Sequence, residues 1–417
     1  MCSIALCLAF LLVQTIFIMH CRPHKTAEIM KDGRVSVKPE INVEEVLKKF
    51  SVKFYKKRFV EDQNLVVAPL LIFKVFRSLY GIMDASAKYD LHSLADIPHN
   101  ASMEKMQEFE TFTDHSLKVC ITKQSQVVAR LYYGKSIGQI NSALKTIETV
   151  TTNFDEKQGF LKQVNDWIKN PQIRGTDDLV HDYDVNKKTE AFLAGAFSFD
   201  WPSQLKLANG EKTFQGEKVQ FLEGNIRTSY AKLDHPKVEV VELKRDELPG
   251  IKLWLILPDK ASSIKEFNDK LNVDIISQIE SGLAKQIADV ALILPRVSIE
   301  YNSQEDAYVM EVFEVFSSLF TTPSIKLAEG KEDLYPVKNF LMKCILRLNA
   351  SETTIETKAQ GGAKNLAFDR PFVLMMLTNN GSVPLMLANY FSPKDKLREL
   401  EEQERKLKAL AQQHIDL

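Results

Sequence analysis

The sequence predicts one large α+β domain rather than a doubly wound parallel sheet. Amphipathic helical patterns dominate the first part of the chain, and apolar runs typical of buried strands dominate the last part. The two kinds of segment do not alternate as regular strand–helix–strand units would. An apolar share of 45%, a charged share of 26% and a net charge of −1 describe an ordinary globular chain. This balance gives no indication of a nucleic-acid partner or of electrostatic attraction to a membrane.

Helical periodicity places apolar residues on one side of several segments. In the second of them, Pro69 stands where its missing N–H costs little, and Ile72, Val75, Phe76 and Leu79 follow at helical spacing. The predicted helices are 44–60, 69–83, 157–170, 263–271 and 309–320.

Strand-like apolar runs separate these helices and fill the later part of the chain. Ala191–Phe199 is apolar almost throughout, which is typical of a central strand buried on both faces. Residues 89–126 carry no clear pattern, and we interpret them as including an insertion. The predicted strands are 64–67, 127–133, 191–199, 238–243, 251–257, 290–294, 340–348 and 372–377.

Both ends of the chain differ from the middle. Ile4–Met19 is an apolar run that is short for a membrane span and suits the core of a signal peptide. We therefore predict a signal peptide over residues 1–22 and secretion to the extracellular space, with an uncleaved anchor as the alternative.

Residues 394–417 are rich in strong helix formers and in Glu–Lys and Glu–Arg pairs four residues apart. They predict a charged helical tail, either solvated or docked on a partner or a second copy.

The cysteines and the glycosylation sequons have separate implications. Beyond residue 22 the chain has Cys120 and Cys344, which are too few for a disulfide framework and match no metal motif. Cys344 lies in an apolar run, which favours a buried thiol, and whether the two cysteines pair stays open. Asn100, Asn349 and Asn380 each begin an N-x-S sequon and are predicted glycosylation sites.

No motif in the chain indicates catalysis. Neither G-x-S-x-G nor H-E-x-x-H occurs, so no serine nucleophile elbow or zinc-protease helix is predicted. We expect no catalytic residues, no metal and no cofactor.

The order of several short motifs resembles the serpin family. These motifs are NLVVAP, VNDWIKN, TEAFLAGAFSFDW, LPRVSIEY and FDRPF. The resemblance covers about Val43 to Pro393 and implies a serpin domain over residues 23–393. It further implies three β-sheets, about nine helices and an exposed reactive loop within Ser351–Ala367. The family's usual activity is suicide inhibition, in which a serine protease cuts the loop and the loop inserts as a new central strand.

The loop departs from the family's pattern. Alternating small and polar residues give it a strand pattern, but Glu352 stands where a flexible glycine is expected and Ile355 where a small Ala would be. The loop is about six residues shorter than usual, which removes about 20 Å of reach at ~3.3 Å per residue. Lys364, Lys358 and Leu366 are the candidate residues for the scissile bond. The predicted loop residues are Ser351, Glu352, Thr353, Ile355, Thr357, Lys358, Lys364, Leu366 and Ala367.

The region that must open for insertion also departs. The family carries a hydrogen-bonded cluster of two Ser, one Asn and one His, and the matching positions here are Ala68, Leu71, Gly195 and Met342. Without these polar partners an apolar sheet would pack shut. The resemblance therefore implies a non-inhibitory serpin, or a weak inhibitor acting as a binding protein. The alternative is an active suicide inhibitor of an extracellular trypsin-like protease, with Lys364 or Lys358 as the bait.

Overall fold

The computed structural model describes residues 27–29, 35–37, 41–123, 125–171, 173, 177–302, 317–350 and 363–393. The predicted signal segment, the helical tail and most of the reactive loop lie outside them. The chain divides into two compact units, residues 1–42 and 43–417. In the first, β1 (Ala27–Ile29) and β2 (Val35–Val37) form an antiparallel hairpin. No helix in the described part is both long and apolar enough to cross a membrane.

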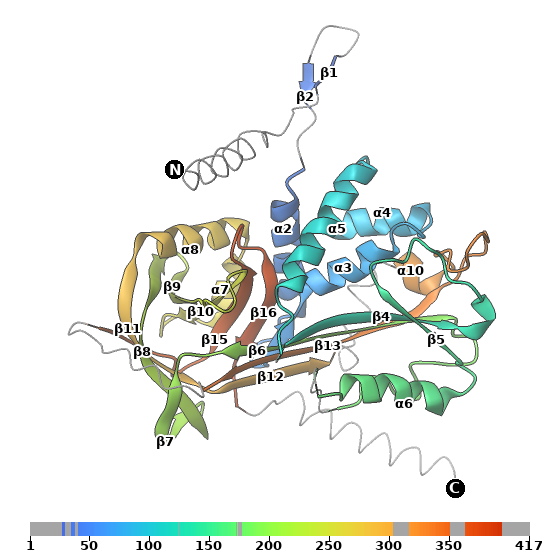
Figure 1. Ribbon diagram of the computed structural model, residues 1–417. Coiled ribbons are helices and arrows are strands. Elements are labelled where there is room, and N and C mark those ends of the chain that lie inside the picture. The colour runs from blue at the N-terminus through green and yellow to red at the C-terminus, as the bar shows by residue number, and fades with distance from the viewer. Residues whose placement is uncertain are drawn as a thin grey trace, which may run out of the picture. The chain divides into compact units, whose positions relative to one another are not determined.

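The described helices lie in the second unit, and their bounds agree with most of the predicted segments (Figure 1). They are α2 (Val43–Arg58), α3 (Pro69–Leu79), α4 (Ala85–Leu94), α5 (Met103–Lys118), α6 (Lys157–Ile168), α7 (Ile264–Lys270), α8 (Val273–Lys285) and α10 (Ser317–Thr321). Lys135–Ile137 adds one 3₁₀ turn. The helix predicted over 69–83 ends at Leu79, and only the last residues of the one predicted over 309–320 are described.

Helices α4 and α5 occupy most of residues 89–126, the stretch that carries no clear pattern in the sequence. Each begins at a capping residue. Asp84 accepts a hydrogen bond from the Ala87 backbone at 2.8 Å, and Ser102 accepts one from Lys105 at 3.2 Å. These caps satisfy N–H groups that the helix itself leaves free.

A five-stranded sheet forms the centre of the unit. Its order is β12 (Val297–Asn302), β13 (Val337–Asn349), β6 (Ala191–Pro202), β4 (Gln126–Gly134) and β5 (Glu148–Thr152). β13 and β6 run parallel, and β6 is buried along nearly its whole length, as its composition predicts. Helix α6 covers one face of this sheet, whereas α3 and α5 lie on the other (Figure 1).

The remaining strands form a nine-stranded array. Its order is β14 (Lys364–Ala367), β11 (Ile287–Pro295), β8 (Glu217–Asp234), β9 (Lys237–Leu243), β10 (Ile251–Pro258), β15 (Phe372–Thr378), β16 (Pro384–Tyr390) and β3 (Leu65–Val67), with β7 (Lys206–Phe214) on β8. The long strand β8 pairs with β11 up to Ser229 and with β9 from Tyr230. It therefore belongs to two sheets, and the array and the five-stranded sheet together give the three sheets that the resemblance implies. The α+β class is confirmed.

Candidate functional site

The line between β13 and β6, called the β13–β6 seam below, is where a new central strand would have to enter. The two strands are paired in parallel from Val337 and Ala191 at one end to Asn349 and Pro202 at the other, with one irregularity near Phe340. Every backbone hydrogen bond between the two strands would have to be replaced by a hydrogen bond to the entering strand. What the side chains do across the seam therefore decides how easily it opens.

At the middle of the seam the contacts are apolar. Gly195 and Met342 are direct cross-strand partners, so the structure brings two of the four predicted sheet-opening positions together. A methyl group built on Gly195 would lie 3.4 Å from Phe340 Cε2 and 3.6 Å from Met342 Cγ. These two side chains cover the space above the glycine. The Phe340 ring also packs against Phe76 of α3, with 5.7 Å between centroids.

The other two predicted positions lie beside the seam rather than in it. Ala68 is fully buried just before α3, and its backbone is a hydrogen-bond partner of the Cys344 thiol on β13. Leu71 is buried on α3 and lines a cavity next to Ala129, the cross-strand neighbour of Gly195. Apolar packing thus surrounds the four predicted sheet-opening positions.

Near its carboxyl end the seam carries an ion pair. Arg347 of β13 and Asp200 of β6 are cross-strand partners, and Arg347 Nη1 lies 3.4 Å from Asp200 Oδ1. Their side chains are only 16% and 10% exposed, so water screens the pair weakly. The Asp200 backbone N–H also donates to Ser125 Oγ at 3.1 Å. Sequence reasoning missed this pair because it depends on the strand register.

Helix α6 bridges the seam through an apolar cluster. Phe160 and Val164 of α6 pack in one buried group with Phe192 of β6 and with Leu341 and Ile345 of β13. The group therefore has members on both sides of the seam. An entering strand would have to displace this layer or lift the helix.

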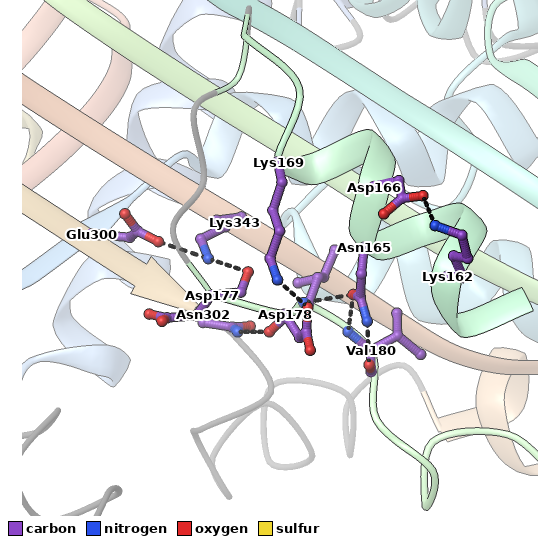
Figure 2. Close-up of polar contacts among 11 residues, drawn as sticks. Lys162, Asn165, Asp166, Lys169, Asp177, Asp178, Val180, Glu300, Asn302 and Lys343 are labelled. Carbon is purple, nitrogen blue, oxygen red and sulfur yellow. Dashed lines mark hydrogen bonds and ion pairs between the residues drawn. The ribbon is translucent and has the colours of Figure 1, made fainter. Parts of the chain in front are cut away.

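The segment that follows α6 is fastened to the sheet by polar contacts (Figure 2). The ammonium of Lys343 on β13, whose side chain has no exposed surface, lies 2.6 Å from Glu300 Oε1 and donates to Asp177 O at 2.9 Å. Asn302 of β12 donates through Nδ2 to Asp178 O at 3.0 Å. A charged residue within the apolar run 340–348 was the only sequence signal for this contact.

The same segment is held by α6 itself. Asn165 Oδ1 accepts hydrogen bonds from the backbone of Leu179 at 2.9 Å and of Val180 at 3.0 Å, and Asn165 Nδ2 donates to Val180 O at 2.8 Å. Lys169 forms an ion pair with Asp178 at 2.6 Å. Figure 2 shows these contacts as one continuous group that links α6 to β12 and β13.

Residues 351–362 lie outside the described part, so the structure gives no position for Ser351, Glu352, Thr353, Ile355, Thr357 and Lys358. The other three predicted loop residues, Lys364, Leu366 and Ala367, belong to β14. This strand runs parallel to β11, with Lys364 opposite Val290 and Ala367 opposite Ile293. Leu366 is buried.

The Lys364 side chain is bound to neighbouring strands. Its ammonium lies 2.8 Å from Glu239 Oε1, 3.9 Å from the centre of the Tyr230 ring, and donates to the Tyr230 hydroxyl. That hydroxyl donates to Glu239 Oε1 at 2.6 Å. Partial burial raises the pKa of Glu239, but the hydrogen bonds from Lys364 and Tyr230 outweigh burial and lower it below its ordinary value. We call this group the Lys364 latch.

Comparison with known proteins identifies the family to which this domain belongs. The profile of the family described as Serpin (serine protease inhibitor) matches residues 45–393, which is most of the chain. The chain belongs to the serpin family. Serpins are in general protease inhibitors rather than catalytic enzymes.

Individual serpins are only distantly similar. A serine protease inhibitor of Rattus norvegicus is 25% identical over 384 residues, covering 83% of this chain and 87% of that protein. The structure of SRPN18 from Anopheles gambiae aligns with a TM-score of 0.69 at 14% identity, covering 84% of this chain and 99% of that one. Thyroxine-binding globulin, solved in complex with thyroxine, aligns with a TM-score of 0.67 at 13% identity, over 84% of this chain and 99% of that one.

The predicted sequons of this serpin lie in different surroundings. Asn100 and Asn380 are exposed, and Asn380 is in the turn between β15 and β16. Asn349 is half-buried at the end of β13, where its Oδ1 accepts a hydrogen bond from Arg296 Nε at 2.8 Å. Asn100 and Asn380 are therefore the more accessible acceptors.

Both described cysteines of the serpin domain are free and buried. Burial raises the pKa of the Cys344 thiol to about 12, and the hydrogen bond with the Ala68 backbone opposes this shift. Burial also raises the pKa of Cys120. Both thiols are protonated at neutral pH, so neither is a nucleophile.

Proposed function

We propose that this serpin is a secreted protein that does not trap proteases efficiently and acts as a binding protein or a weak inhibitor. The observation that carries the proposal is the set of side-chain contacts across the β13–β6 seam. Loop insertion would have to part Arg347 from Asp200 and move Phe340 and Met342 away from Gly195.

Opening this seam is costly for two physical reasons. A charge that loses its partner in a poorly hydrated place costs several kcal/mol, about 3–5 kcal/mol for a fully buried pair. A polar cluster that re-forms around the new strand would offset part of such a cost, but apolar residues fill the positions of that cluster here. The closed sheet is therefore favoured over the expanded one relative to an inhibitory serpin.

The Lys364 latch adds a second, independent argument. A trypsin-like protease must accept the lysine side chain in its specificity pocket and an extended, unpaired backbone around the scissile bond. Lys364 instead pairs with β11 through its backbone and with Glu239 through its ammonium. Cleavage after Lys364 would require β14 to detach first, which leaves Lys358 as the more accessible site.

An active inhibitor of an extracellular trypsin-like protease is the second candidate. Its support is the strand-like alternation of residues 353–363 and the five-stranded state of the sheet, in which β13 and β6 are adjacent. In that case Lys358 is the expected bait, with Lys364 released only after β14 detaches.

Secretion and glycosylation complete the proposal. The apolar run at Ile4–Met19 supports a cleaved signal peptide, and Asn100 and Asn380 are the proposed glycan sites. Residues 394–417 are proposed as the helix through which a protein partner or a second copy docks. No cofactor is part of this function.

Incubation with equimolar trypsin tests the proposal. We expect the serpin to be cut within the loop while trypsin keeps its full activity, with no complex on a denaturing gel. A denaturant-resistant band at the combined mass, together with stoichiometric loss of trypsin activity, would establish the inhibitor instead.

A further inference from the structure

A cavity outside the seam has the properties of a small-molecule site. It lies on the face of the five-stranded sheet opposite α6, between α3, α5, β4 and the start of β5, and its volume is about 460 Å³. Pockets for small ligands span roughly 300–1,000 Å³. Leu71 and Val75 of α3 and Leu117 of α5, all buried, form its apolar wall. The exposed side chain of Ile121 extends that wall outward.

The cavity exists because β4 presents small side chains to this face. Val127 and Ala129 are two residues apart on the strand and therefore share one side of the sheet. Val128 packs against the α6 cluster on the other side. Ala129 contributes only a methyl group to the floor of the cavity, which leaves room between the sheet and helices α3 and α5.

The charges that line the cavity are mostly compensated by neighbours. Lys74 lies 2.8 Å from Asp114, so these lining charges cancel. Glu148 is compensated by Arg130 at 2.9 Å. Lys118 also lines the cavity, is exposed, and has no acidic partner within ion-pair distance among the described residues. A buried apolar wall with this cation at its rim is complementary to a ligand with an apolar body and one negative charge.

We propose that this cavity binds an amphipathic monoanion of the fatty-carboxylate class, with the apolar chain against Leu71, Val75 and Leu117 and the carboxylate on Lys118. The inference does not depend on whether the reactive loop inserts. Its two parts are separable, because the apolar wall supplies affinity and Lys118 supplies preference for an anion.

Calorimetric titration of the whole protein with dodecanoate tests the site, and dodecan-1-ol serves as the uncharged probe of equal chain length. We expect dodecanoate to bind one site and Ala129→Phe, which fills the cavity, to weaken binding at least tenfold. Lys118→Glu should weaken it about two- to fivefold, the upper part of the range for an exposed ion pair. Lys218→Glu, a charge reversal on the exposed side of β8, should leave binding unchanged.

Three outcomes would overturn the proposal. They are no dodecanoate binding by the unaltered protein, equal binding by Ala129→Phe, and equal loss in Lys118→Glu and Lys218→Glu. Dodecan-1-ol binding as tightly as dodecanoate would refute the role of Lys118. The melting temperature of each variant shows whether it is folded. Lys118→Glu changes only an exposed side chain, so it keeps the test valid if Ala129→Phe does not fold.

Discussion

The ion pair across the β13–β6 seam offers the most quantitative prediction. Arg347 and Asp200 lie 3.4 Å apart, which at an effective dielectric constant of about 20 gives a Coulombic attraction of about 5 kcal/mol. Desolvation removes much of this attraction, because the side chains are 16% and 10% exposed. We expect a net coupling energy of about 2 kcal/mol, in the range of a hydrogen bond to a charged group.

A double-mutant cycle of Arg347→Ala and Asp200→Ala, followed by denaturant unfolding, measures that coupling. The matched control is Arg227 and Asp289, also direct cross-strand partners, at 3.5 Å but with side chains 69% and 32% exposed. Solvent screening should reduce the control coupling to about 0.2–1 kcal/mol. Equal coupling energies for the two pairs, or a seam value below that of the control, would refute the reasoning.

Three further predictions concern other contacts of the domain. Lys364→Met should lower the free energy of unfolding by about 1 kcal/mol at neutral pH. Because the pKa of Glu239 is lowered, the difference from the unaltered protein should shrink as pH falls through that lowered pKa, and the contact of Lys364 with Tyr230 should account for what remains. Burial lowers the pKa of His92, and the hydrogen bond to Pro98 O opposes this shift only in part. The unfolded chain therefore binds the proton more readily, so stability should decline as pH falls below about 6.5. In thermal unfolding, His92→Gln should reduce that decline. Gly381→Ala should lower the free energy of unfolding by about 1 kcal/mol, because the φ angle of Gly381 is +73°. The same loss should occur in a Glu44→Ala background, which removes the side chain nearest to Gly381. If the loss disappears in that background, crowding against Glu44 and not the backbone angle is its cause.

Segments with a complete local pattern were predicted well. The helices near Glu44 and Pro69 and the strand at Ala191–Phe199 follow from periodicity or from continuous burial, both of which can be read over one short stretch. Helices α4 and α5 were missed because a charged or polar residue interrupts each apolar stripe, although their caps at Asp84 and Ser102 are visible in the sequence. The α8 helix and the long strand β8 were also not predicted.

The candidate site could be predicted only in part. The resemblance to serpins placed Gly195 and Met342 at the seam, and the structure has them as cross-strand partners. It could not indicate the Arg347–Asp200 pair, whose members are 147 residues apart in the chain and meet only through strand register. The Lys364 latch could not be predicted for the same reason. Tyr230 lies on β8 and Glu239 on β9, and strand pairing through β11 brings these strands close to β14.

The melting temperature of the protein before and after one cut in the loop tests the central claim most directly. Limited trypsin digestion should cut after Lys358, and mass spectrometry of the nicked protein can verify the site. If the seam stays closed, the cut relieves no stored energy, and the melting temperature should change by less than about 3 °C. A large upward shift would mean that the cut loop enters the sheet between β13 and β6, which would contradict the account.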